Sequence, residues 1–392
     1  MEKVKLGDIA TVITKGTTPT TIGFNFVERG INFVKIESIT ENGQFLQDKF
    51  AFIDEYCNKK MQRSQLQEND ILFSIAGAIG RTAIVTENIL PANTNQALAI
   101  IRIPDGKIFY PYLLYVLQSP VIFKQFEKKK QGVAQLNLSL KDVSELEIPL
   151  PSLEEQKAIA EKLDKVSGLI EKRKTQLEKL DLLIKSRFIE MFGDTGKQVP
   201  LTDYICFQEG PGVRSVDFTE DGTILLTGSN INDNTISFGH KSDRHISNEL
   251  ASGKYAHFMC DKDDILVVSS AIDPNKFDKK VVVVDVDKKY CLNTGIIRFK
   301  PNKQYLTLGY FREFLKTDYF KHQVSSEMRG IAQMHFGPSH LNQMTILLPD
   351  SIERQVEFET FVQQTDELKF KIQKSLEKLE ILKKSLMQQY FG

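Results

Sequence analysis

An internal duplication at almost half the chain length constrains the fold of this 392-residue sequence more than any other feature. The tetrapeptide Gly132–Gln135 recurs as Gly330–Gln333, 198 residues later. Asn69–Leu72 recurs as Asp263–Leu266, 194 residues later. Matches that keep their order at a nearly constant shift indicate two copies of one structural unit, with loops of slightly different length.

The first part of each copy reads as a mixed α/β domain. Two stretches, 112–127 and 308–322, have apolar residues at helical spacing and are expected to be helices. Regular strand–helix–strand alternation is missing, which argues against a doubly wound parallel sheet. Short β-branched runs bounded by turn residues predict strands at 31–36, 71–75, 97–103, 224–227, 265–269, 281–286 and 295–299.

The second part of each copy predicts a long helix. The stretch from Glu154 to Phe192 has no proline and one glycine, and its apolar residues follow alternating steps of three and four. A helix of about 37 residues would be about 55 Å long, too long to lie within one small domain. We expect the two helices to pack on each other through Leu163, Val166, Ile170, Leu177, Leu180 and Ile184 in the first copy, and Leu368, Ile372, Leu379, Leu382 and Leu386 in the second.

These parts predict an α+β architecture of four segments. Globular domains at residues 1–152 and 194–350 alternate with helical regions at 153–193 and 351–392. Antiparallel pairing of the two helices as a coiled coil would relate the two domains by a pseudo-twofold axis. Each domain could then bind a similar ligand independently.

Composition narrows the class of protein. The 51 basic and 51 acidic residues balance, so general attraction to nucleic acid is not expected, although a local basic face is compatible with this count. The four cysteines lie far apart and form no CxxC pair, which argues against a disulfide scaffold or a zinc ribbon. No apolar run reaches the roughly 18 residues of a membrane span. We therefore expect a cytoplasmic protein.

Catalytic motifs are missing from the sequence. It contains no GxxxxGK[ST], HExxH or GxSxG motif. His257 and Cys260 are three residues apart, but no second ligand pair follows at zinc spacing. We expect a non-catalytic chain that binds no cofactor or metal of its own.

Polar loop residues suited to DNA recur at matched places in both copies. Amide side chains can pair with adenine and arginine with guanine, while hydroxyl groups and lysine suit phosphates. In the first copy the candidates are Lys15, Thr17, Thr18, Ser74, Arg81, Asn93, Asn95, Gln96, Lys128, Lys129, Lys130 and Gln135. In the second they are Arg214, Ser229, Asn230, Ser269, Ser270, Asn293, Thr294, Arg329, Gln333 and His335.

The chain resembles the DNA-specificity subunits of type I restriction–modification systems over its whole length. Pro149–Gln156 and Leu347–Gln355 are similar to the family's proline-rich stretch that opens each long helix. The duplication and the two heptad helices complete the resemblance. The second copy departs from the pattern at Pro349–Asp350, which leaves the equivalence of individual loops open.

The resemblance implies that each recognition domain reads one half of a bipartite, asymmetric double-stranded DNA site. It implies that the helices set the spacer and dock two methyltransferase subunits. S-adenosylmethionine would belong to those partners, and ATP and Mg to separate restriction–translocase subunits. This chain would contribute no catalytic residue.

Two other classes remain open at this point. The neutral net charge is compatible with a coiled-coil scaffold whose globular domains bind protein. An enzyme with an unrecognised site near His335 or Asp273 is the other alternative.

Overall fold

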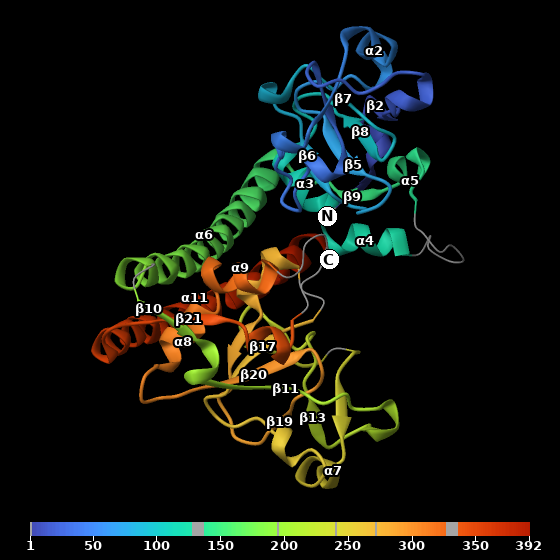
Figure 1. The fold of residues 1–392 in the computed structure, drawn as a ribbon. Coiled ribbons are helices and arrows are strands. Elements are labelled where there is room, and N and C mark those ends of the chain that lie inside the picture. The colour runs from blue at the N-terminus through green and yellow to red at the C-terminus, as the bar shows by residue number, and fades with distance from the viewer. Residues whose placement is uncertain (1, 128–136, 194–195, 240, 271–272, 327–335) are drawn as a thin grey trace. The chain divides into compact units, whose positions relative to one another are not determined.

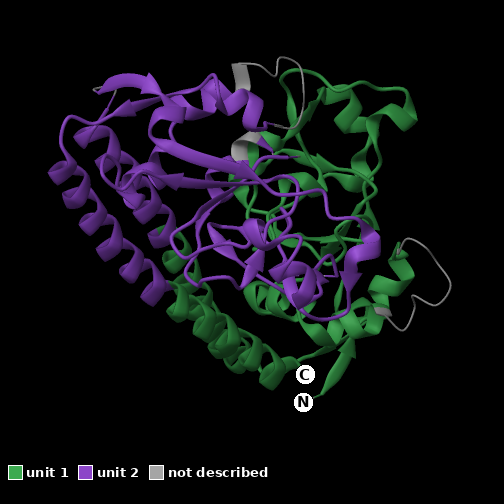
Figure 2. Cartoon of the chain, turned by 60° about the horizontal axis from the view of Figure 1, so that its bottom comes forward, with its two compact units in different colours: residues 1–175, 373–392 green, residues 176–372 purple. Residues whose placement is uncertain are grey.

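The computed structural model describes residues 2–127, 137–193, 196–239, 241–270, 273–326 and 336–392 (Figure 1). The chain divides into two compact units, coloured separately in Figure 2. Unit 1 contains residues 1–175 and 373–392, and unit 2 contains residues 176–372. Each unit therefore takes one globular part of the chain and one portion of each long helix.

Unit 1 is built on an antiparallel sheet in the order β2-β8-β5-β6. Ile71, Phe73, Ala99 and Ile101 are fully buried on its central strands, where they contact the helices that follow. The strands are β2 Val12–Lys15, β8 Leu98–Arg102, β5 Ile71–Ser74 and β6 Thr82–Ile84. The terminal strands β1 Lys3–Lys5 and β9 Glu147–Pro149 pair antiparallel beside it.

A smaller sheet in unit 1 has the order β4-β3-β7. Its strands are β4 Ala51–Ile53, β3 Ile31–Val34 and β7 Ala92–Thr94, and β3 runs parallel to β7. Helix α2, Glu55–Lys60, begins at Asp54, whose carboxylate accepts a hydrogen bond from the Cys57 N–H at 2.7 Å. Phe33, Ile53, Cys57 and Met61 form a small core between this sheet and α2.

Unit 2 repeats both sheets. The larger has the order β11-β20-β17-β18, with strands Ile205–Glu209, Ile296–Pro301, Ile265–Val268 and Val281–Val283. The smaller has the order β12-β16-β13-β19, with strands Phe218–Thr219, Arg244–Ile246, Thr223–Leu225 and Tyr290–Cys291. The parallel pair β13–β19 matches β3–β7 of unit 1. Further pairs are β10 Lys197–Pro200 with β21 Thr345–Leu348, and β14 Ile231–Asn232 with β15 Thr235–Ile236.

A buried aspartate precedes the same central strand in each unit. Asp70 accepts two hydrogen bonds from Arg102, both at 2.7 Å, and these bonds raise the pKa of the arginine. Asp264 pairs with Arg298 at 3.4 Å. Both aspartates also accept a hydrogen bond from the N–H three residues upstream. The repeated Asp-Ile-Leu motif is therefore explained by an internal ion pair.

The two stretches predicted as single helices are each divided in two. Residues 112–127 fall into α3 Tyr110–Leu117 and α4 Pro120–Glu127. Residues 308–322 fall into α8 Leu308–Phe314 and α9 Asp318–Ser326. Proline fits the first turn of a helix but not its interior, so Pro120 starts a new helix. Other short α-helices of the described residues are α1 Leu6–Ile9, α5 Leu140–Ser144, α7 Asn248–Ser252 and α10 Pro338–Leu341.

The long helices are α6 Leu153–Met191 and α11 Ile352–Phe391. A buried glutamine in the first turn of each accepts a hydrogen bond from the residue that caps the N-terminus of a short helix, α3 in unit 1 and α8 in unit 2. The Gln156 side chain accepts from the Phe109 N–H at 2.8 Å and donates to the Pro151 carbonyl at 2.8 Å. Gln355 repeats this arrangement with the Thr307 N–H and the Tyr305 carbonyl, both at 3.0 Å.

Contacts within each unit show that α6 and α11 run antiparallel. In unit 1, Leu163 near the start of α6 shares a core with Phe391 at the end of α11. In unit 2, Phe188 near the end of α6 lies against Phe358 near the start of α11, with ring centroids 5.5 Å apart. Opposite ends of the two helices therefore meet in each unit, as expected for an antiparallel pair.

Burial along the helices follows the expected seam in α6 but not in all of α11. In α6, Leu163, Val166, Ile170 and Ile184 are buried, and Leu177 and Leu180 are half-buried. In α11, Ile372 is buried and Leu379 and Leu386 are half-buried.

The prediction is wrong for Leu368 and Leu382, which are 47% and 46% exposed. In the predicted seam, the position that follows Ile372 lies three residues later. In the structure it is the buried Leu376, four residues later. The seam of α11 therefore passes one residue beyond the two leucines. A step of three residues and a step of four residues after Ile372 both continue a heptad repeat, so the sequence pattern alone does not select between them.

Candidate nucleic-acid interface

A turn of unit 2, residues 210–217, leads from β11 to the smaller sheet. It starts at Gly210, where a Cβ atom would lie only 2.2 Å from the carbonyl oxygen of Asn293. The Thr294 N–H donates to the Pro211 carbonyl at 3.0 Å. The turn ends at Asp217, whose carboxylate accepts from the Tyr255 hydroxyl at 2.9 Å. The turn is thus held at both ends.

Unit 1 has the same construction in residues 16–24. A Cβ atom at Gly16 would lie 1.8 Å from the Thr94 carbonyl oxygen, and the Thr17 N–H donates to that oxygen at 3.2 Å. The Thr18 hydroxyl contacts the side-chain oxygen of Gln96. Close approach of two backbone segments, which only glycine permits, therefore positions equivalent turns in both units.

The candidate residues that reach solvent lie on or beside these turns, or on a neighbouring loop. Lys15, Gln96, Arg214, Ser229 and Thr294 are exposed. Thr17, Thr18, Arg81, Asn95, Ser270 and Asn293 are half-buried. The Arg81 guanidinium already donates to the Ile39 carbonyl at 3.2 Å, so part of its hydrogen-bonding capacity serves the fold.

Four candidate residues are buried, and the prediction that they contact DNA is wrong for them. Ser74 donates to the Ala78 carbonyl at 2.7 Å. Asn93 donates to the side-chain oxygen of Asn58 at 2.9 Å, and Asn230 donates to Asp243 at 2.8 Å. Ser269 is 1% exposed at the end of β17. The first three show that short polar side chains beside strands satisfy groups inside a fold as readily as they face solvent. The Ser269 hydroxyl has no hydrogen-bond partner among the described residues.

Seven candidates lie outside the described residues. They are Lys128, Lys129, Lys130, Gln135, Arg329, Gln333 and His335. Their assignment to the DNA interface stays a prediction.

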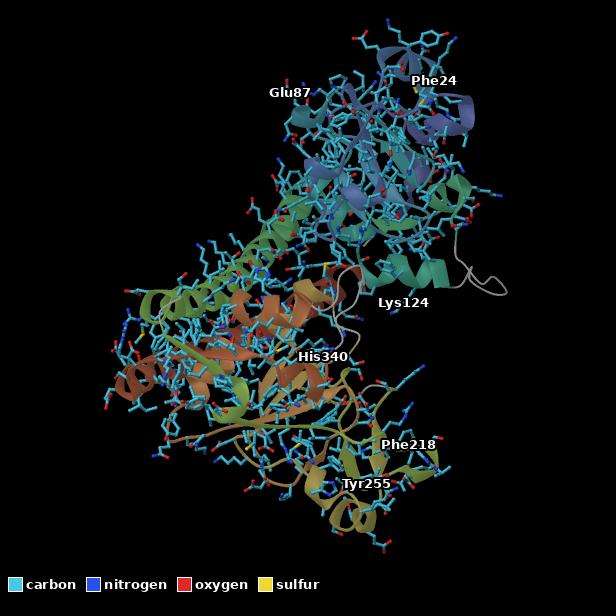
Figure 3. All side chains as sticks on the ribbon, in the orientation of Figure 1. Phe24, Glu87, Lys124, Phe218, Tyr255 and His340 are labelled. Carbon is cyan, nitrogen blue, oxygen red and sulfur yellow. The ribbon has the colours of Figure 1, made fainter. Side chains whose placement is uncertain are left out.

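Cation–aromatic pairs beside the turns were missed by the sequence reasoning. Lys35 Nζ lies 4.5 Å from the centroid of the Phe26 ring in unit 1. In unit 2 the guanidinium carbon of Arg244 lies 5.9 Å from the centroid of Phe218, which is labelled in Figure 3 together with Tyr255. Phe26 precedes β3 in unit 1, and Phe218 is the first residue of β12 in unit 2. The paired residues are nine positions apart in unit 1 and 26 apart in unit 2, and neither spacing identifies such a contact in the sequence.

Exposed apolar residues on the long helices recur in the two copies. Leu169 and Leu368 are 199 residues apart, as are Leu182 and Ile381, and Leu183 and Leu382. Unit 1 presents one complete set of three, and unit 2 presents the other. Single exposed apolar residues are common on protein surfaces, but recurrence of all three at one shift is a signal for an interface. This shift could have been found in the sequence.

No group of three or more His, Cys, Asp or Glu side chains that could hold a metal ion occurs within the described ranges. Of the helices in those ranges, none is both long and apolar enough to cross a membrane.

The family model described as "Type I restriction modification DNA specificity domain" matches residues 1–180 and 197–382. The two matches coincide with the two copies seen in the sequence. The chain belongs to this family of type I restriction–modification specificity proteins.

Curated relatives carry the same description. A stretch of 142 residues is 35% identical to the type I restriction enzyme EcoBI specificity subunit of Escherichia coli, covering 36% of this chain and 29% of that protein. A stretch of 161 residues is 30% identical to the MjaVIII specificity subunit of Methanocaldococcus jannaschii, covering 39% and 38%. The chain thus spans less than two fifths of each relative.

Solved structures share the fold over the whole chain. One comes from a study of complex assembly and conformational transition of the type I R-M system, with a TM-score of 0.58 at 17% identity, covering 100% of this chain and 97% of the other. Another is the type I restriction–modification S subunit from M. genitalium, with a TM-score of 0.54 at 15% identity and coverage of 100% and 96%. Two globular parts that alternate with long helices along the chain are therefore the fold that these structures share.

Proposed function

We propose that this chain is the sequence-recognition subunit of a type I restriction–modification complex, in which each unit reads one half of a bipartite DNA site. The observation that carries the proposal is the repeated turn held by Gly16 in unit 1 and Gly210 in unit 2. Each turn places exposed groups of the types that bind phosphates and base edges beside a backbone contact that both units share. The side chains differ between the copies, so the two half-sites are expected to differ.

The long helices are proposed to dock two methyltransferase subunits. Each unit presents one apolar set, Leu169 with Ile381 and Leu382 in unit 1, and Leu368 with Leu182 and Leu183 in unit 2. Two equivalent surfaces on one chain fit two copies of one partner. Burial of these residues in a complex would remove apolar area that the isolated chain leaves in water.

Catalysis is assigned to the partners. The methyltransferases would bind S-adenosylmethionine and modify adenine, and restriction–translocase subunits would use ATP and Mg. This chain would hold the duplex while the partner extrudes the base. Such a complex acts on host DNA, so its place would be the cytoplasm.

The experiment is co-expression of this chain with the methyltransferase subunit encoded beside it, followed by sequencing of methylated adenines in the host DNA. Two short conserved blocks at a fixed spacing are the expected result. A soluble complex that produces no methylated motif would contradict the proposal. Docking is tested by Leu183→Glu and Leu382→Glu, each of which should lower the number of bound methyltransferase subunits from two to one. The matched control is Ile189→Glu, an exposed α6 position with glutamine at the equivalent place in α11. If both docking variants still bound two subunits, the assigned surface would be wrong.

A further inference from the structure

Val216 is a nearly bare aliphatic side chain on a turn that is otherwise tied to the fold. It lies in the short 3₁₀ helix Ser215–Asp217 and is 84% exposed. Exposed valines are ordinary where the chain is free to move, but this turn is held on both sides of the residue. Its position therefore does not depend on burying its own side chain.

The attachments of this turn fix it before any ligand arrives. The Asp217 carboxylate accepts hydrogen bonds from the Tyr255 hydroxyl at 2.9 Å and the Lys254 ammonium group at 3.2 Å, and these bonds lower the pKa of Asp217. The Asp217 N–H also donates to the Arg214 carbonyl at 2.9 Å. Together with the contact of Gly210, these bonds hold Val216 in one place. A side chain held in this way loses little entropy when it binds.

Unit 1 repeats this arrangement with Ile22. That residue ends the 3₁₀ helix Pro19–Ile22 and is 41% exposed. The Phe24 N–H donates to the Pro19 carbonyl at 3.0 Å, and the Phe24 ring lies against Tyr56, with ring centroids 5.7 Å apart. Both units thus present a β-branched aliphatic residue from a 3₁₀ turn at the same point of the fold. Branching at Cβ also restricts the side-chain rotamer.

The surroundings indicate the size and chemistry of the contacted group. Gly212, Arg214, Ser215 and Thr219 around Val216 are exposed and polar or lack a side chain. Val213 and Phe218 on either side of Val216 are half-buried, so Val216 is the one fully exposed apolar residue of this turn. In unit 1, Phe26 and Val27 near Ile22 are 36% and 37% exposed. Such small apolar areas are far below what a stable protein interface needs. A guanidinium and a hydroxyl group beside Val216 suit phosphate oxygens. The apolar group available on the base edges of the major groove is the 5-methyl group of thymine.

We infer that Val216 and Ile22 are specificity-determining residues, each contacting the methyl group of a thymine in the half-site that its own unit reads. The inference rests on the proposed function and adds the chemical group that each turn recognises. It predicts at least one thymine in each half-site whose methyl group contributes to binding.

The test uses the full complex with its methyltransferase subunits and synthetic duplexes of the methylated site. Each thymine of the site is replaced in turn by deoxyuridine, which lacks only the methyl group. For the wild-type complex, we expect one replacement in each half-site to raise Kd about fourfold, the magnitude of burying one methyl-sized group. In Val216→Ala this sensitivity should disappear in one half-site and persist in the other. Ile22→Ala should show the reverse.

The matched control is Val286→Ala, a 42% exposed valine of unit 2 away from the turn. It should keep both sensitivities. The inference is wrong if no deoxyuridine replacement in a half-site changes Kd, if Val216→Ala retains every deoxyuridine effect, or if it weakens thymine and deoxyuridine duplexes equally at all positions. A wild-type complex that binds no bipartite site contradicts the proposed function itself, and that outcome is seen before any variant is made.

Discussion

The ring of Phe391 lies edge-on against the ring of Tyr112, with ring centroids 5.6 Å apart. Phe192 and Tyr310 repeat this contact in unit 2, with ring centroids 4.9 Å apart. The hydroxyl groups of Tyr112 and Tyr310 donate to the Pro149 and Leu347 carbonyls. The last turn of one long helix therefore closes a core that also contains the strand preceding the other helix.

Removal of the Phe391 ring should destabilise unit 1. The residue is 5% exposed, and Phe→Ala at such a site costs about 3 kcal/mol or more. Hydrogen exchange of the full chain should show faster exchange of unit 1 amides in Phe391→Ala, with unit 2 unchanged. The control is Phe370→Ala on the same helix, where the ring is 60% exposed and little effect is expected. Equal effects of the two variants would contradict the role given to Phe391.

A buried ion network should make unit 2 sensitive to acid. The Glu313 carboxylate accepts from Arg312 at 2.8 Å and from Lys316 at 3.0 Å. Burial acts to raise the pKa of Glu313, but the Lys316 and Arg312 cations outweigh it and hold that pKa below its ordinary value of 4.5. The stabilisation is therefore present above about pH 4.5 and decreases as the pH falls through the lower folded-state value.

Glu313→Gln should lower the free energy of unfolding at pH 7 by about 3 kcal/mol, because Lys316 and Arg312 lose their shared buried carboxylate. Among the described residues, only Arg312 of these two keeps another acidic partner, Asp366. The substitution should also remove part of the decrease in stability as the pH falls below about 4.5. Denaturant unfolding at pH 7 and below about pH 4.5 measures both effects. Glu367→Gln, at an exposed position of α11, is the control. A Glu313→Gln variant as stable as the wild type would show that the network contributes nothing net.

Substitutions of Leu163 and Leu169, both on α6, should distinguish an effect on folding from an effect on partner binding. Leu163 is fully buried and Leu169 is 45% exposed. Leu163→Asp buries an unpaired charge and should unfold unit 1 or cost several kcal/mol, on the order of 3–5. Leu169→Asp should leave the unfolding transition in place and weaken binding of a methyltransferase subunit. Circular dichroism melting and pull-down of the co-expressed partner measure the two effects. Loss of stability in Leu169→Asp would remove it from the docking surface.

Exchange of the first recognition domain should change one half of the methylated site. If residues 1–152 are replaced by those of another family member, the block read by unit 1 should change while the block read by unit 2 stays the same. Sequencing of methylated adenines shows which of the two blocks has changed. A change in both blocks would show that recognition is not divided between the units.

The duplication, the long helices and most of the α6 seam could be predicted from residue order alone. Heptad spacing and repeated motifs are local properties, so Leu163 and Ile184 could be placed on the seam without knowledge of the fold. The family resemblance followed from the same motifs. The residues of α11 that form the seam could not all be predicted. Leu368 fits one heptad pattern, Leu376 fits a pattern displaced by one residue, and both patterns are apolar.

Local sequence does not say which polar residues of a recognition unit face solvent. Asn93 and Arg214 both suit a DNA contact by composition, yet Asn93 is buried against Asn58 while Arg214 is exposed. The difference arises from how the strands stack, which depends on contacts between residues far apart in the chain. The same holds for Val216, an unremarkable valine in the sequence. Only the backbone contact at Gly210 and the bond from Tyr255 to Asp217 set it on a held turn, because these join three distant segments.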